Sequence, residues 1–260
     1  LGRVAPHTGG GKHSREGKYR MKAILLAAGR GKRLQWLTAG RPKSLLEFGG
    51  ETLLARHLRG LRQAGVEEIG VVTGYQAAQV KDELLAAGCI CPVHEIFNPH
   101  YEHGSALSVL AASGFASGSD FLLLDADVLC GPEMLLRLAG ADAPNCLLVD
   151  QLAVDTGEEV KVVIEPDGRV SRLAKLLPPS TGVAGESVGF FKFQTEAGRR
   201  LFEILTGLSS AEPETEYEAG IDRLLEEIRF EAIDIHGLPW IEIDFPEDLE
   251  RALKEVYPRL

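Results

Sequence analysis

The chain has 260 residues, of which 45% are hydrophobic and 25% charged, a balance typical of a folded globular protein. Its formal net charge of −10 argues against general binding to nucleic acid. No apolar run reaches the roughly 18 residues that a membrane-spanning helix needs, so we expect neither nucleic acid nor a membrane as a partner.

Residues 1–20 are basic and rich in glycine, and they lack the apolar stretch of a signal peptide. We expect them to be a disordered extension that lies outside the fold. Within them, Gly9-Gly10-Gly11-Lys12 resembles part of a Walker loop. No strand precedes it and His13 stands where Ser or Thr is needed, so we do not expect it to bind phosphate.

The apolar run from Ala23 to Leu26 leads into small residues and then into a loop with two glycines and several cations. This pattern predicts a buried strand that delivers a flexible cationic loop to the edge of a sheet. Backbone N–H groups freed by glycine, together with cations, form a site for a polyanion such as a nucleoside triphosphate. The residues expected at the nucleotide are Leu26, Ala27, Ala28, Gly29, Arg30, Gly31 and Lys32. Leu34 excludes a dinucleotide-binding fingerprint, which needs a small residue there.

Helices and strands alternate after this loop. Apolar residues at helical spacing predict helices over 52–64 and 77–87, and short apolar runs predict strands over 68–73 and 90–96. The alternation predicts an α/β fold with a doubly wound, mostly parallel sheet. Ligands are then expected at the carboxyl ends of the strands.

The polar segment 98–105 precedes a predicted helix over 106–112. Gly104 and Ser105 stand where a helix start is capped and backbone amides are presented. His100 and His103 have no third ligand nearby, so we interpret them as loop residues and not as metal ligands.

An apolar strand expected over 121–129 carries Asp125 and Asp127. We expect these two carboxylates to face opposite sides of the sheet, one toward the ligand and one capping the turn. A carboxylate at the end of a buried strand is costly unless it is paired or bound to a cation. Mg²⁺ prefers carboxylate and phosphate oxygens, which makes it the expected cofactor.

Beyond residue 145 the strands follow one another without helices between them, and a Pro-Asp-Gly turn at 166–168 predicts a hairpin. We expect a mixed edge of the sheet and a small acceptor-binding subdomain over roughly residues 145–230. The acidic run 212–218, which contains Tyr217, is typical of a solvated helix start. Acids beside an aromatic ring would also suit a quaternary ammonium group.

Near the carboxyl end, Glu242 and Asp244 alternate with isoleucines in a predicted strand and therefore share one face. The strand leads into a helix with Pro246 in its first turn.

Together these segments resemble the nucleotidylyltransferases, which join an NTP to a sugar phosphate or to a small phosphorylated alcohol. The motifs are Gly29-x-Gly31-x-Arg33-Leu34, Arg41-Pro42-Lys43-Ser44 and Trp240-x-Glu242-Ile243-Asp244-x-Pro246. The resemblance covers residues 21–257 as one domain with a Rossmann-like nucleotidyltransferase fold. Lys32 and Trp36 depart from the pattern of the hexose enzymes. Asn98-Pro99, Gly185-Glu186 and the closing motif are similar to the CTP:phosphocholine cytidylyltransferase-like branch.

The resemblance implies roles for individual residues. Arg33 would contact the β- and γ-phosphates, and Lys43 the α-phosphate and the attacking oxygen. Gly104 and Ser105 would contact the nucleoside. Mg²⁺ would be held by Asp127, Asp244 and Glu242, and the acceptor would meet Asn98, Lys175, Glu186, Glu216 and Tyr217. The implied partners are CTP and phosphocholine or a related amino-alcohol or polyol phosphate.

Two other functions stay open. One is a sugar-1-phosphate nucleotidylyltransferase that uses UTP, dTTP or GTP, and the other is a non-catalytic nucleotide-binding module. The joint presence of Arg33, Lys43 and the two metal acids argues against the module. The four cysteines lack metal-ligand spacing and are interpreted as reduced thiols of a cytoplasmic protein. A homodimer is also left open.

Overall fold

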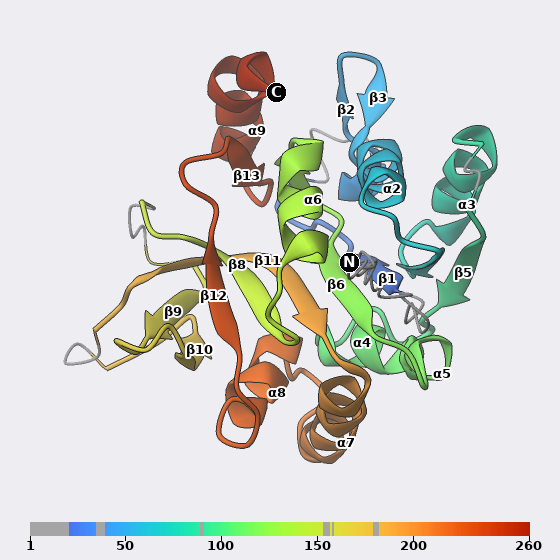
Figure 1. The fold of residues 1–260 in the computed structure, drawn as a ribbon. Helices are drawn as coiled ribbons and strands as arrows, with labels where there is room; N and C mark the ends of the chain where they lie inside the picture. Colours follow the sequence, from blue (N-terminus) through green and yellow to red (C-terminus); the bar gives the residue numbers. More distant parts are fainter. Residues whose placement is uncertain (1–20, 35–39, 89–90, 153–156, 158, 179–181) are drawn as a thin grey trace, which may run out of the picture.

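The computed structural model describes residues 21–34, 40–88, 91–152, 157, 159–178 and 182–260. The extension expected over residues 1–20, and Trp36, lie outside these ranges. The described residues form a nine-stranded sheet with the order β10-β9-β11-β6-β1-β4-β5, and β8 joins it between β11 and β12 (Figure 1).

The strand β1 (Lys22–Ala27) lies at the centre of the parallel part of the sheet. It pairs with β4 (Glu68–Thr73) on one side and with β6 (Phe121–Asp125) on the other, and β5 (Val93–Phe97) continues beyond β4 in the same direction. A continuous apolar run suits such a strand because both of its faces are covered. The doubly wound, mostly parallel sheet expected from the sequence is confirmed.

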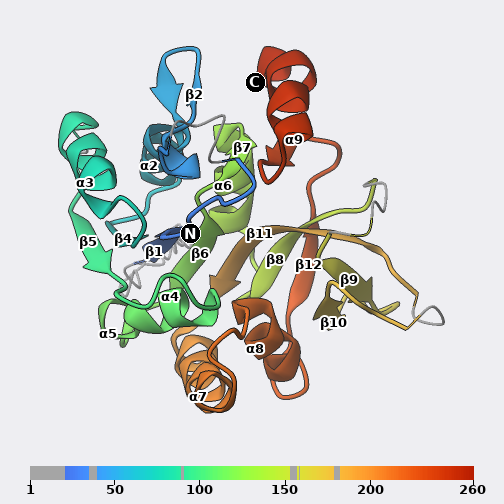
Figure 2. The ribbon, with the colours of Figure 1, turned by 180° about the vertical axis from the view of Figure 1, so that it is seen from behind.

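Helices cover both faces of this sheet (Figures 1 and 2). One core cluster, with Ala23 and Leu25, includes apolar side chains of α2 (Leu53–Gln63), α3 (Ala77–Ala86) and α6 (Pro132–Gly140). A second cluster, with Ile24, includes those of α4 (Ala106–Ala111), α7 (Thr195–Ala211) and α8 (Tyr217–Leu224). Successive side chains of β1 therefore pack against helices on opposite faces of the sheet, as strand alternation requires. The short helix α5 (Ser113–Ala116) follows α4.

The strands of the second half extend this same sheet. They are β8 (Cys146–Asp150), β9 (Lys161–Ile164), β10 (Val170–Ala174), β11 (Gly185–Phe193) and β12 (Glu231–Asp234). One edge of β11 contacts β9 with its first residues and β6 with its last, all antiparallel. Gly189 lies between these two stretches with a φ of +77°, a conformation that favours glycine.

Two small sheets complete the fold. β2 (Glu47–Phe48) pairs with β3 (Glu51–Thr52), and β7 (Val128–Cys130) pairs with β13 (Trp240–Glu242), both antiparallel. The single strand expected over 121–129 is thus broken after Asp125, because β7 leaves the main sheet to pair with β13. The helix α9 (Pro246–Arg251) continues in helical turns to residue 259. No described helix is long and apolar enough to cross a membrane.

His57 of α2 is a buried histidine whose protonation should affect stability. Its Nε2 lies 2.9 Å from the carbonyl oxygen of Val128, and burial lowers its pKa to about 4, although the Val128 bond and Asp127 act in the opposite direction. The histidine of an unfolded chain has a pKa near 6.5. Each unit by which the pKa of the folded state differs from this value corresponds to about 1.4 kcal/mol of stability. The folded state therefore binds fewer protons than the unfolded state below that pH, and the free energy of unfolding falls as the pH drops from about 6.5 toward 4.

We expect His57→Gln, whose amide can still donate to Val128, to remove this part of the acid sensitivity. Urea unfolding at pH 7 and pH 4.5 should show that the wild type loses about 2 kcal/mol more than the variant. Equal losses in the two proteins would mean that His57 does not carry the effect.

Candidate active site

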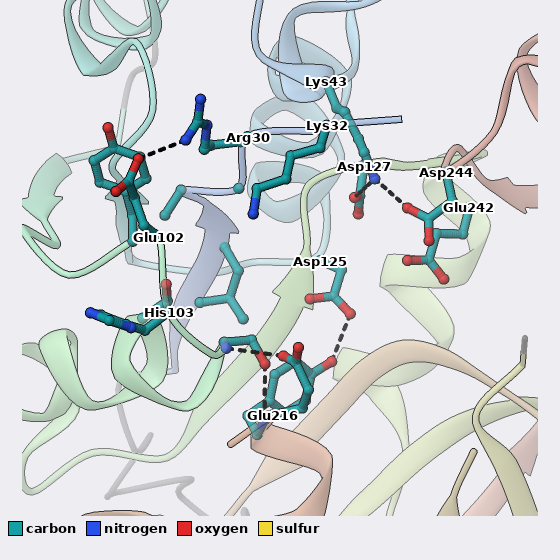
Figure 3. Close-up of a pocket in the computed structure, with 18 of the residues that line it drawn as sticks. Arg30, Lys32, Lys43, Glu102, His103, Asp125, Asp127, Glu216, Glu242 and Asp244 are labelled. Atoms are coloured by element: carbon teal, nitrogen blue, oxygen red, sulfur yellow. Dashed lines mark hydrogen bonds and ion pairs between the residues drawn. The ribbon is translucent and has the colours of Figure 1, made fainter. Parts of the chain in front are cut away.

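A cavity of about 400 Å³ opens at the carboxyl ends of β1 and β6 (Figure 3). The loop that follows β1, from Gly29 to Arg33, forms one wall. Lys175 and the start of α8, from Glu216 to Glu218, form another, and the acids at the ends of β6 and β13 lie between them. The cavity therefore lies where a doubly wound sheet is expected to bind its ligand.

Lys43 lies in the 3₁₀ turn Lys43–Leu45, and its side chain passes beside Gly31 of the loop to reach the carboxylates. Its Nζ donates to Asp127 Oδ2 at 3.0 Å and also to Asp244 Oδ1. A Cβ at Gly31, where φ is +56°, would lie 2.8 Å from Lys43 Cγ, so the glycine leaves room for the lysine side chain. Burial alone would lower the pKa of Lys43, but the two carboxylates outweigh it and raise the pKa. The ammonium is therefore charged at neutral pH.

Asp127, Glu242 and Asp244 bring carboxylate oxygens within 4.8 Å of one another. Burial acts to raise the pKa of Asp244, but Lys43 and then Arg33 outweigh it and hold the pKa below its usual range. Loss of surrounding water, followed by repulsion from Asp127 and Asp244, raises the pKa of Glu242 to about 8, although the residue as a whole is exposed. An all-oxygen set of converging carboxylates fits a hard cation such as Mg²⁺.

The arginines of the loop are held in different ways. The Arg33 guanidinium lies 3.6 Å from Asp244 Oδ2 and 4.4 Å from the centre of the Phe245 ring. Arg30 donates to Glu102 Oε1 at 2.7 Å, and both residues line the cavity. Lys32 extends its ammonium into the cavity (Figure 3). The loop thus presents cationic side chains along the wall where a triphosphate was expected.

Gly104 and Ser105 form hydrogen bonds with residues 213–217, at the start of α8. The amide of Ser105 donates to Glu216 Oε2 at 3.0 Å, and the hydroxyl of Ser105 accepts from the amide of Tyr217 at 2.9 Å. Gly104 donates to the carbonyl of Pro213 at 3.1 Å, and a Cβ there would lie 2.1 Å from the carbonyl oxygen of Thr215. These amides are therefore engaged by the segment before α8 and are not free to bind a nucleoside.

Asp125 and Asp127 both line the cavity, which corrects the expectation that they lie on opposite faces. The expectation was wrong about the spacing, because residues two positions apart share one face of a strand. β6 ends at Asp125, where the amide of Ala126 donates to the carbonyl of Leu26 at 3.1 Å, and both carboxylates stay on the cavity side. Burial, then repulsion from Asp127, Glu218 and Glu242, raises the pKa of Asp125 well above its usual value. The hydroxyl of Tyr217 donates to Asp125 Oδ2 at 2.6 Å.

Most residues expected at the site line the cavity: Leu26, Ala28, Gly29, Arg30, Gly31, Lys32, Arg33, Lys43, Ser105, Asp127, Lys175, Glu216, Tyr217, Glu242 and Asp244. Ala27 and Gly104 lie next to lining residues in the chain but do not line it. Asn98 is buried and donates to Ser108 Oγ at 3.0 Å, and Glu186 of β11 lies opposite Asp150 of β8 in the sheet register. Neither residue lines the cavity. The geometry gives no support to a direct contact of these two with an acceptor.

Sequence reasoning missed several lining residues, namely Tyr101, Glu102, His103, Ser108, Asp125 and Glu218. Asp125 and Glu218 carried a signal, since one is half of a pair of aspartates and the other ends an acidic run. Burial raises the pKa of Glu218 to about 7, and its Oε2 is buried without a hydrogen-bond partner among the described residues.

Residues 23–180 match the model of the MobA-like NTP transferase domain. The chain belongs to this family. The match covers more than half of the chain and confirms the family that the glycine loop and the Pro-Lys motif indicated.

Curated relatives of this NTP transferase chain carry different names. It is 35% identical over 238 residues to the "Bifunctional IPC transferase and DIPP synthase" of Rubrobacter xylanophilus, covering 90% of this chain and 51% of that protein. It is 25% identical to the "CTP:phosphoglutamine cytidylyltransferase" of Campylobacter jejuni, covering 90% of this chain and all of that protein. An "N-acetylmuramate alpha-1-phosphate uridylyltransferase" of Neisseria meningitidis is 37% identical over 42% of this chain and 48% of that protein. The chain thus spans about half the length of several relatives.

Solved structures share its fold. The inositol-1-phosphate CTP transferase from T. maritima aligns with a TM-score of 0.78 at 22% identity, over 94% of this chain and 96% of that chain. The CTP:phosphocholine cytidylyltransferase from Streptococcus pneumoniae aligns with a TM-score of 0.70 at 19% identity, over 89% and 97% of the two chains. The expected Rossmann-like nucleotidyltransferase fold is therefore confirmed.

Proposed function

We propose that the chain is a Mg²⁺-dependent cytidylyltransferase that couples CTP to a small phosphorylated alcohol and releases pyrophosphate. The observation that carries this proposal is the position of Lys43, whose ammonium lies between Asp127 and Asp244 beneath the glycine loop. One cavity wall offers cations for a triphosphate, and the facing acids suit a divalent metal. Relatives and structural neighbours named for CTP support the choice of nucleotide.

In this reaction an oxygen of the acceptor phosphate attacks the α-phosphorus of CTP, and the bond to the pyrophosphate oxygen breaks. Such a transfer needs in-line positioning and neutralisation of charge more than covalent chemistry. Lys43 would contact the α-phosphate and the attacking oxygen, and Arg33 the β- and γ-phosphates. Asp127, Asp244 and Glu242 would hold Mg²⁺, which when bound neutralises charge on the phosphates. Leu26, Ala28 and the side chain of Ser105 line the same cavity, and the nucleoside would lie against them.

A second candidate is a sugar-1-phosphate nucleotidylyltransferase, which the uridylyltransferase relative favours. Both candidates use the same phosphate chemistry and differ in the base and in the acceptor. The cytoplasmic location expected from the cysteines also stays a proposal. It is supported by Cys130 and Cys146, which are buried free thiols, as is usual in a reducing compartment.

A matrix of nucleotides against acceptors tests the proposal. Pyrophosphate release is measured with Mg²⁺ for CTP, UTP, dTTP, GTP and ATP, each with inositol 1-phosphate, phosphocholine, phosphoethanolamine and glucose 1-phosphate. We expect CTP to exceed the other nucleotides by about tenfold or more, as base-reading hydrogen bonds allow, and EDTA to abolish release. Preference for UTP or dTTP with a sugar phosphate would support the second candidate. If no nucleotide–acceptor pair released pyrophosphate, a non-catalytic nucleotide-binding module would be the remaining interpretation.

A further inference from the structure

Asp125 is held in one orientation from two sides. The hydroxyl of Tyr217 donates to its Oδ2. A Cβ at Gly189 would lie 2.3 Å from the same oxygen, so only glycine fits at this position of β11. Tyr217 is itself fixed, because it is 2% exposed and its ring packs edge-on against Phe191 with centroids 5.9 Å apart. The carboxylate therefore projects into the cavity from a rigid support (Figure 3).

The free oxygens near this carboxylate lack hydrogen-bond donors. Among the described residues, Asp125 accepts a bond only at Oδ2, which leaves Oδ1 available in the cavity wall. Glu218 Oε2, on the same side of the cavity, is buried without a partner. Buried polar atoms of folded proteins are nearly always paired, and an unpaired one is costly. The cavity thus presents carboxylate oxygens that a ligand with hydrogen-bond donors would satisfy.

We propose that Asp125, positioned by Tyr217, binds a hydroxyl group of the acceptor and selects polyhydroxylated alcohol phosphates. This inference rests on the proposed function and names the acceptor class for the same site. A hydroxyl group donates to a carboxylate, whereas a quaternary ammonium carries no N–H and leaves both oxygens unpaired.

The aromatic content of the cavity supports the same choice. Recognition of quaternary ammonium groups uses the faces of several aromatic rings. Among the described lining residues the tyrosines are Tyr101 and Tyr217, and the ring of Tyr217 is buried against Phe191. The acceptor side of the cavity is therefore better suited to a cyclitol or sugar-alcohol phosphate than to phosphocholine, the acceptor favoured by sequence.

The test compares Asp125→Asn and Tyr217→Phe with the wild type, using inositol 1-phosphate and CTP. We expect Asp125→Asn to raise the KM for the acceptor about tenfold or more, because one acceptor oxygen is replaced by an amide group that cannot accept a hydrogen bond from the substrate hydroxyl. Tyr217→Phe keeps the ring and should raise it about threefold to fivefold. The KM for CTP and the Mg²⁺ concentration for half-maximal rate should stay within about twofold in both, since neither residue is expected to contact nucleotide or metal. Asp142→Asn, at an exposed position that does not line the cavity, is the matched control.

The outcomes separate this inference from the function on which it rests. If the wild type releases pyrophosphate but both variants keep the wild-type acceptor KM, the assignment of Asp125 is wrong. Faster wild-type turnover of phosphocholine, or of phosphoethanolamine, than of inositol 1-phosphate would overturn the choice of a polyol. No release with any nucleotide and acceptor overturns the proposed function and this inference with it. If Asp125→Asn does not fold, the acceptor KM of Tyr217→Phe and the acceptor preference of the wild type test the inference instead.

Discussion

Lys43→Ala is expected to lower kcat for pyrophosphate release by about a hundredfold or more, which is typical for loss of a group that stabilises charge in the transition state. The ammonium lies 3.0 Å from Asp127 Oδ2 and also bonds Asp244, so its removal leaves two facing carboxylates without a cation between them. We therefore also expect a lower melting temperature in the variant. Steady-state rates at saturating CTP, together with thermal unfolding, measure both effects.

Arg41→Ala provides a matched control from the same Arg-Pro-Lys motif. Its guanidinium is exposed, lies 3.2 Å from Glu47 Oε1 and does not line the cavity. Exposed ion pairs of this kind contribute little to stability, so the rate should stay close to that of the wild type. Near-wild-type turnover in Lys43→Ala would remove Lys43 from the mechanism, and an equal loss in Arg41→Ala would point to a general disturbance of the motif.

The parallel half of the fold could be predicted because its signals are local. Each strand is a short apolar run and each helix repeats apolar residues along one face, so the strand expected over 68–73 matches β4 and the helix expected over 77–87 ends one residue earlier as α3. The break after Asp125 could not be predicted in this way. It depends on β7 pairing with β13, whose residues lie more than a hundred positions later in the chain.

The same division applies to the site. The motifs that the family shares indicated Lys43, Asp127 and Asp244, and the structure brings the three together. The bond between Ser105 and Glu216 joins residues 111 positions apart, and a polar loop gives no sign of such a partner. For the same reason Asn98 could not be recognised as a buried residue bonded to Ser108, because its burial is decided by the packing around α4.

Asp127→Asn is expected to lower kcat by about a hundredfold or more and to raise the Mg²⁺ concentration for half-maximal rate. The amide keeps the size of the side chain but removes the negative charge that pairs with Lys43 and that a divalent cation needs. Pyrophosphate release measured over a range of Mg²⁺ concentrations gives both quantities. Glu247→Gln, at an exposed acid in the first turn of α9, should change neither.

The comparison of Asp127→Asn with Asp125→Asn is the sharpest test of how the cavity is divided. The two aspartates are two residues apart, line the same cavity and receive the same substitution, but their partners differ: Lys43 for Asp127 and Tyr217 for Asp125. Because Asp127 pairs with an ammonium and Asp125 with a hydroxyl, we expect Asp127→Asn to change kcat and the Mg²⁺ dependence. Asp125→Asn should instead change the KM of the acceptor. If both variants lost kcat and Mg²⁺ response alike, the two carboxylates would act as one metal-binding unit, and the acceptor would have to be recognised by Glu216, Glu218 and Lys175 instead.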